Sequence, residues 1–147
     1  MYEFLQQIHA GWGILTLILL LIAVVNSLIG RSSKKEFLSK DRKITLFALI
    51  ATHIQFLIGI AIYFNSPRGL AVLGEMKNDA LRLTSMEHPL VNLIAITLIT
   101  MGWSRHKKLA GSAAIFKNFL IFYGIGLLLI LSRLPWDLLS EVFESSH

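Results

Sequence analysis

The sequence predicts an all-α protein, an antiparallel bundle of four transmembrane helices that forms a single domain over residues 1–147. Hydrophobic residues make up 54 % of the chain, and the mean hydropathy is +0.64. These residues fall in four blocks instead of at amphipathic spacing. No polar segment is large enough to shield the blocks from water, so the composition indicates a membrane protein.

Each of the four blocks is expected to form a helix. About 20 residues at 1.5 Å each cross the hydrocarbon core. By that measure the first, second and fourth blocks are long enough to span, and the third is near the lower limit. The N-terminus has neither the basic region nor the cleavage pattern of a signal peptide, so the first block is expected to remain a helix. In order, the blocks are Ile8–Ile29, Ile44–Phe64, Pro89–Trp103 and Ala113–Leu131.

The basic residues predict the orientation. The first connection, RSSKKEFLSKDRK, and the third, SRHKKLAGSAAIFK, hold 10 of the 14 Lys and Arg residues. Because Lys and Arg are enriched in cytoplasmic loops, both connections should be cytoplasmic and both termini should lie on the outer side, as in a bacterial inner membrane. The excess positive charge is then explained by topology and by attraction to the lipid bilayer, and it does not indicate nucleic acid.

The outer segments carry weaker signals. Ser66-Pro67 and Gly69 mark a turn after the second block, and residues Leu73–Leu83 are expected to form a short interfacial helix. The fourth helix should stop at Leu134-Pro135, with Trp136 at the outer interface.

Three histidines lie where lipid offers an imidazole little hydration. His9 opens the first block, His53 lies inside the second, and His88 opens the third. Counting helical rise from the basic connections places His9 about 33 Å, His88 about 26 Å and His53 about 15 Å from the cytoplasmic side. His9 and His88 thus share the outer third with Arg133, at about 24 Å, and His53 lies near the midplane. Two further histidines are expected to be solvated, one in a basic connection and one at the chain end: His106 and His147.

Small residues recur on the helix faces just inside these polar groups. They let helix backbones approach closely, and they equally leave room for a flat ligand between helices. Both interpretations stay open for these positions: Gly13, Ala95, Gly102 and Gly126.

Imidazoles on facing helices at matched depth predict a b-type haem, because the iron takes two opposed nitrogen ligands and the macrocycle needs an apolar slot. On depth, His9 with His88 is the better axial pair. His53 would ligate a second haem, serve a proton or quinone site, or hydrogen-bond to a Thr or carbonyl of another helix. Arg133 is a candidate partner for the haem carboxylates or a snorkelling end residue. Asn92 either lines the same site or bonds between helices.

The chain resembles small four-helix membrane proteins of the cytochrome b-like kind over nearly its whole length. The matching segments are HAGWGILTLILLL, THIQFLIGIAIYFNSP, MEHPLVNLIAITLITMGWSRHKK and FYGIGLLLILSRLPW. The resemblance implies a four-helix membrane architecture, with His9, His53 and His88 as candidate ligands of one or two haems.

The expected function is therefore single-electron transfer with a quinone or a partner redox protein, as a component of an oxidoreductase. Two other classes stay open. One is copper or zinc handling by His9, His53 and His88, with Glu87 as a further ligand. The other is a structural subunit without a cofactor, in a larger complex or a homo-oligomer. The chain has no Cys, which excludes disulfides, thiolate metal sites, iron–sulfur clusters and c-type haem attachment.

Overall fold

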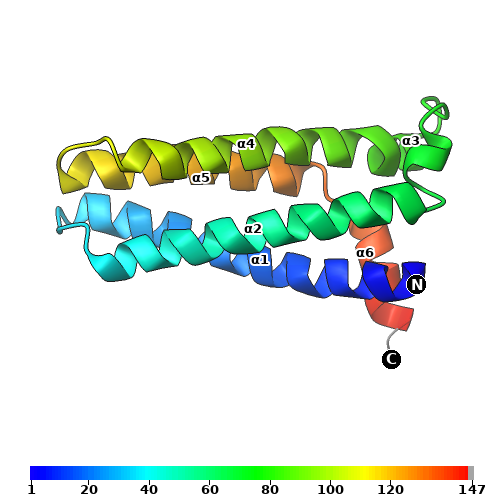
Figure 1. Ribbon diagram of the computed structural model, residues 1–147, viewed down its shortest axis with the longest axis horizontal. Coiled ribbons are helices and arrows are strands. Elements are labelled where there is room, and N and C mark those ends of the chain that lie inside the picture. Colours follow the sequence, from blue (N-terminus) through cyan, green and yellow to red (C-terminus); the bar gives the residue numbers. More distant parts are fainter. Residues whose placement is uncertain (146–147) are drawn as a thin grey trace.

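The computed structural model describes residues 1–145, and this part of the chain is helical with turns and no strand. Four helices are long and apolar enough to cross a membrane, which confirms the predicted fold class at that level (Figure 1). His147 lies outside the described residues. The long helices are α1 (Tyr2–Ser32), α2 (Ser39–Asn65), α4 (His88–His106) and α5 (Ser112–Ser132).

The long helices lie side by side along the long axis of the molecule (Figure 1). The α1–α2 and α4–α5 connections meet at one end, and both termini lie at the other. Helix α1 packs extensively on α2 and α5, and α4 packs extensively on α5, whereas α2 and α4 share a smaller contact. The fold is therefore tightest around α1 and α5, and it is more open between α2 and α4.

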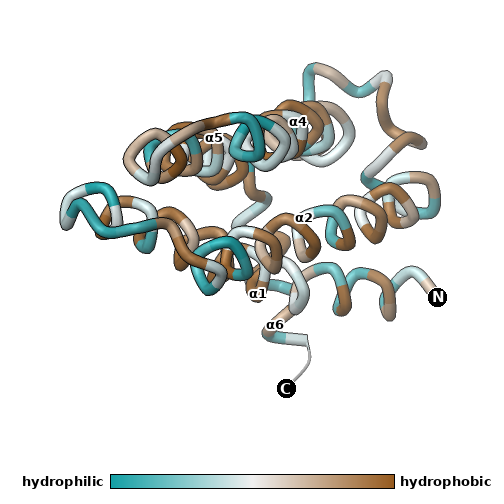
Figure 2. Tube along the Cα trace, turned by 60° about the vertical axis from the view of Figure 1, so that its left-hand side comes forward, coloured by the Kyte–Doolittle hydropathy of each residue, from teal (hydrophilic) through white to brown (hydrophobic). Residues whose placement is uncertain are grey.

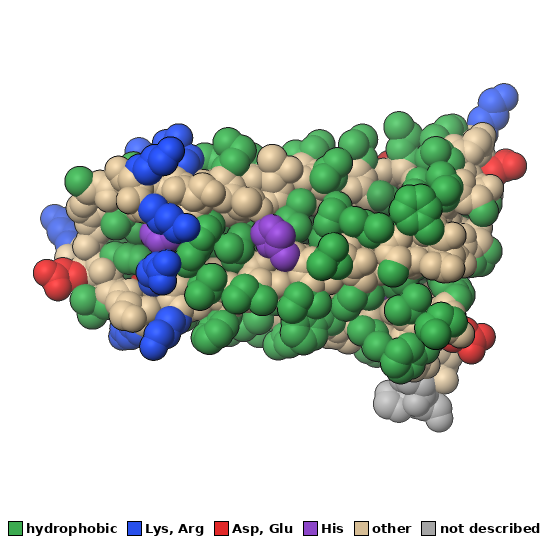
Figure 3. All heavy atoms as spheres, viewed as in Figure 1, with side chains coloured by type: hydrophobic (Ala, Val, Ile, Leu, Met, Phe, Trp, Pro, Cys, Tyr) green, Lys and Arg blue, Asp and Glu red, His purple; other side chains and the backbone are tan. Residues whose placement is uncertain are grey.

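The core is apolar, and so is most of the outer surface. Leu20, Ile99, Phe119 and Tyr123 are fully buried, while large aliphatic side chains are exposed along the helices. Hydrophobic residues run along all four long helices (Figure 2). On the face shown in Figure 3, most of the Lys and Arg side chains gather at the end that holds the α1–α2 and α4–α5 connections. Such an apolar band with a basic rim is what lipid contact requires.

Glycines on α4 and α5 serve close helix packing. A Cβ added at Gly126 would lie 2.7 Å from Ile99 Cγ1 and 3.3 Å from the Ala95 carbonyl oxygen. One added at Gly102 would lie 2.6 Å from Phe122 Cβ. These two glycines therefore do what small residues do in membrane helix contacts: they let neighbouring helices approach.

Replacing Gly126 by Ala should destabilise the protein by about 1–3 kcal/mol, because the new methyl group overlaps Ile99 in a packed contact. Gly124→Ala is the matched control, since a Cβ there meets nothing within 4 Å. Denaturant unfolding in detergent micelles, followed by helical circular dichroism, measures both. Equal stabilities for the two variants would show that the Gly126 contact is not tight.

A buried carboxylate joins α1 to the start of α2. The Asp41 side chain has no exposed surface. It accepts hydrogen bonds from Asn26 Nδ2 at 2.9 Å, from the Leu38 backbone nitrogen at 2.9 Å and from Lys35 Nζ at 3.2 Å. Asp41 thus caps α2 at its N-terminus and ties the polar connection to α1.

The expectation that His106 is solvated was wrong. Its side chain is buried at the end of α4, where the ring packs against Phe37, Trp103 and Phe119, and its Nδ1 hydrogen-bonds to the Trp103 carbonyl. The connection between α4 and α5 is short, so the last residue of α4 stays inside the bundle. Aromatic side chains there enclose the His106 ring. The position of a residue in a charged segment did not indicate its depth.

The segment between α2 and α4 differs from the expected interfacial helix. Residues 73–78 form turns, and helix resumes only at α3 (Asp79–Arg82), after a 3₁₀ turn at Leu70–Val72. Asn78 caps α3, since its side-chain oxygen accepts from the Leu81 nitrogen at 3.1 Å. A π-helical turn, Leu83–Glu87, then joins α3 directly to α4, so one continuous helical span covers residues Asp79–His106.

A further helix, α6 (Trp136–Ser145), follows the expected stop after α5. It lies at the end of the molecule that holds the termini (Figure 1) and packs on α1. Trp136 is exposed and Val142 is buried. The spacing of its apolar residues, opposite three acidic ones, is that of an amphipathic helix. This amphipathic spacing is present in the sequence of residues 136–145, for which no helix was predicted above.

Candidate cofactor site

One cavity of about 200 Å³ lies between α1, α2, α4 and α6, toward the end of the molecule that holds the termini. Its lining on α1 runs from Tyr2 to Leu17, about 22 Å of helix. Toward the termini, polar side chains such as Gln6 and Arg68 line it together with aliphatic side chains of α6. Further in, Ile96 and Ile130 line it together with Thr16 and Thr52. The lining is thus mostly apolar, with one cation, Arg68, toward the termini.

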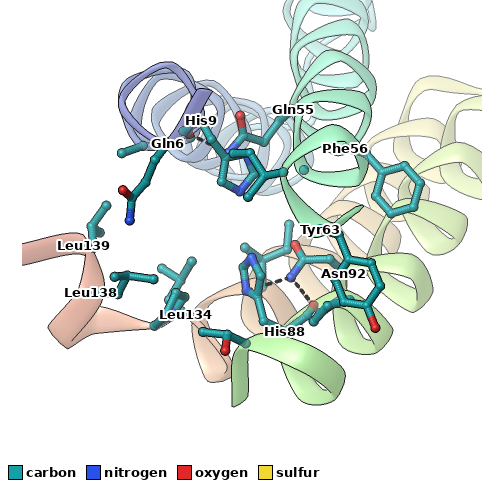
Figure 4. A pocket seen from close by; sticks show the side chains of 18 of the residues that line it. Gln6, His9, Gln55, Phe56, Tyr63, His88, Asn92, Leu134, Leu138 and Leu139 are labelled. Carbon is teal, nitrogen blue, oxygen red and sulfur yellow. Dashed lines mark hydrogen bonds between the residues drawn. The ribbon is translucent and has the colours of Figure 1, made fainter. Parts of the chain in front are cut away.

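His9 of α1 and His88 of α4 face one another across this cavity (Figure 4). Their ring centroids are 6.3 Å apart, and the ring planes are nearly perpendicular, at 84°. Two imidazoles 79 positions apart in the sequence are therefore brought together at the end of the bundle where the count of helical rise placed both.

The hydrogen bonds of His88 define which of its nitrogens is available. Nδ1 lies 3.0 Å from the Arg133 carbonyl oxygen, which only accepts, so this hydrogen bond forms in the tautomer that carries the proton on Nδ1. Asn92 donates from Nδ2 to the His88 carbonyl at 2.6 Å and lies 3.1 Å from Nδ1. The lone pair is then on Nε2. Metal-ligating histidines commonly show this arrangement, with the other ring nitrogen bound to a carbonyl.

A proline shapes the backbone that carries His88. Pro89 has no N–H and its ring crowds the carbonyl four residues earlier, that of Ser85. The helix widens into the π turn at Leu83–Glu87, and Tyr63 of α2 donates its hydroxyl to the Ser85 carbonyl at 2.8 Å. Tyr63 thus supplies the donor that Pro89 lacks and ties α2 to the start of α4.

His9 is held by backbone contacts and leaves its ring nitrogens unbonded. Gln55 Nε2 donates to the His9 carbonyl at 2.7 Å. Gly59 makes room for the ring, because a Cβ there would lie 3.2 Å from His9 Cε1. Within residues 1–145, His9 Nδ1 and Gln55 Oε1 are buried without a hydrogen-bond partner. Orphaned buried polar atoms beside a cavity indicate a missing partner, such as a ligand or an ordered water.

His53 does not line the cavity. Its Nδ1 lies 2.9 Å from the Leu49 carbonyl, and its Nε2 lies 3.3 Å from Thr100 Oγ1 of α4. Both ring nitrogens of His53 therefore have partners in the protein. Of the roles considered for His53, this arrangement corresponds to a hydrogen bond to a Thr of another helix. His53 links α2 to α4 across their smaller contact.

Asn92 and Arg133 were also predicted as candidate site residues. Asn92 lines the cavity, and the side chain of Arg133 does not. The Arg133 Nε lies 3.7 Å from Glu87 Oε2. Its contribution to the site is its backbone carbonyl, which orients His88.

The described residues contain no group of three or more His, Cys, Asp and Glu side chains arranged to hold a metal ion. His9 and His88 converge, but His53 does not join them. A three-histidine metal site is therefore not formed by the described part of the chain.

Several lining residues were missed in the sequence. Arg68 lies in a turn, and turns carry no periodicity. Gln55 lies on the opposite side of α2 from His53, and that is the side that faces the cavity. Other lining residues that the sequence did not reveal include Tyr2, Gln6, Tyr63, Ser66, Leu138 and Leu139.

The chain matches no protein-family model, and comparisons with curated proteins and with solved structures gave no match.

Proposed function

We propose that the protein is an antiparallel four-helix membrane protein that holds a b-type haem between His9 and His88 and carries single electrons. The basic connections would face the cytoplasm of a bacterial inner membrane and the termini the outer side. The cofactor would then lie near the outer surface. The observation that carries the proposal is the pair of imidazoles facing each other across the cavity.

The spacing of the two rings suits one shared iron. Two imidazoles bound to opposite sides of one metal ion, at about 2 Å per bond, have ring centres roughly 6 Å apart. The centroids of His9 and His88 are 6.3 Å apart. The His88 tautomer leaves Nε2 as a lone-pair donor, and His9 has no competing hydrogen bond within the described residues. The donor set therefore fits a bis-imidazole haem.

The volume of the cavity limits how a haem could be accommodated. The cavity holds about 200 Å³, below the roughly 300–1,000 Å³ of most small-molecule sites. A macrocycle bound here would therefore extend between helices toward the surface. Its apolar edge would contact aliphatic side chains or lipid, which costs little in a membrane.

Haem supplies one-electron redox chemistry, and the protein supplies ligands, an apolar slot and local charge. His9 and His88 would set the axial field, and the Arg133 carbonyl would raise the basicity of His88 through its hydrogen bond. The electron partner would be a quinone in the bilayer or a redox protein that docks on the outer side.

A reduced-minus-oxidised spectrum of the protein, purified after expression with added haem precursor, tests the proposal. We expect Soret and α bands and close to one haem per chain by pyridine haemochrome assay. Metal analysis of the same sample separates the alternatives. Copper or zinc in place of haem would favour metal handling by two imidazoles, and a colourless, metal-free, stable protein would favour a structural subunit. Either result would overturn the haem proposal.

A further inference from the structure

Arg68 is a cation at the outer end of the cavity. It lines the cavity and is half-buried. Within residues 1–145 its side chain makes no ion pair, whereas nearby Arg82 pairs with Asp79 at 2.9 Å and with Glu87 at 2.9 Å. A charge that is partly removed from water is expected to have a partner. Within the described residues Arg68 has no such partner, so a ligand is its natural partner.

Other hydrogen-bonding groups surround the same end of the cavity. Ser66 is buried, and its Oγ accepts from the Arg68 backbone nitrogen at 3.0 Å. The same Oγ donates to the Tyr2 hydroxyl at 3.2 Å. The Tyr2 proton is thereby left for a further acceptor, and Gln6 adds an amide to the lining. Donors predominate at this end, and a guanidinium with hydroxyl donors is suited to a carboxylate.

We infer that Arg68, supported by Tyr2, binds the carboxylate groups of the cofactor and so determines its orientation in the cavity. This inference rests on the proposed haem function and assigns the carboxylates to Arg68, not to Arg133, which pairs with Glu87. The position of this cation at one end of the cavity gives the direction. The carboxylate edge lies toward Arg68 at the outer surface, and the apolar edge lies toward Leu17, Ile96 and Ile130.

Titration of purified apoprotein with haem b and with its dimethyl ester tests this assignment. The ester has the same iron and ring but no negative carboxylates. We expect the wild-type protein to bind haem b at least about tenfold more tightly than the ester, because a charge-assisted hydrogen bond is lost. Arg68→Gln should weaken haem b binding by a similar factor, leave ester binding unchanged and so remove the preference. His88→Ala protein provides the blank for porphyrin dissolved in detergent.

Lys77→Gln is the control variant. It removes one positive charge from the same outer segment, but Lys77 is exposed and does not line the cavity. Its affinities for both porphyrins should equal those of the wild type.

The outcomes separate the two proposals. Equal binding of haem b and ester by the wild type, or an equal loss of both in Arg68→Gln, would overturn the role of Arg68 and leave the haem site intact. Failure of the wild type to bind either porphyrin would overturn both proposals. The wild-type comparison needs no variant, so it remains decisive even if Arg68→Gln does not fold.

Discussion

His9→Ala and His88→Ala should each remove the Soret and α bands of the haem-loaded protein, with bound haem reduced at least about tenfold. The reason is that iron held between two imidazoles loses one of its only two protein ligands in either variant. His88→Ala also leaves the Arg133 carbonyl without its donor. The measurement is the pyridine haemochrome content of equal amounts of folded, detergent-solubilised protein.

His53→Ala is the matched control for these variants. It removes an imidazole from a membrane helix, but one that lies outside the cavity and bonds to Leu49 and Thr100. We expect its haem content to be that of the wild type. Unchanged bands in both His9→Ala and His88→Ala would refute the axial pair. Loss of the bands in His53→Ala alone would instead place the haem at the α2–α4 contact.

The second large effect concerns stability. Asp41→Ala should lower the free energy of unfolding by about 3 kcal/mol, because it leaves three partly buried donors without their shared acceptor at the α1–α2 turn. The carboxylate is fully buried and bonds to Asn26, Lys35 and the Leu38 backbone. The N-terminal cap of α2 is lost in the same step. Unfolding in mixed micelles at several denaturant concentrations, followed by circular dichroism, measures the difference.

Lys35→Ala provides the comparison within the same network. The Lys35 side chain is one-third exposed, so water replaces much of what its ion pair supplies, and the loss should stay below about 1 kcal/mol. If both variants lost the same small amount of stability, the buried carboxylate would contribute no more than a surface ion pair.

These two predictions concern opposite ends of the molecule. The Asp41 network lies at the basic end, and the His9–His88 pair lies toward the termini. Since the two sites share no residue, their effects should be independent. Asp41→Ala protein that remains folded should still bind haem. His9→Ala protein should keep the hydrogen bonds of Asp41 and the stability that they provide.

The sequence alone determined the four long apolar helices and the positions of the polar residues along them. Apolar blocks about 20 residues long leave the backbone no alternative to helix in lipid, because every peptide group must bond within its own segment. Helical rise is constant, so counting from the basic connections placed His9 and His88 in the same outer third before any contact was known. Their observed proximity follows from that regularity.

Only the tertiary structure decided which side chains face which cavity. Helix rotation depends on packing, and the periodicity of these nearly uniform apolar helices does not reveal it. For this reason His53 was grouped with the other two histidines although it bonds to Thr100, and His106 was expected in water although aromatic rings enclose it. Arg68 was recognised as a candidate ligand-binding residue only because a turn places it in the lining of the cavity. Contacts between residues distant in sequence form only when the helices pack. The pattern of residues along one helix does not show toward which neighbouring helix a side chain points.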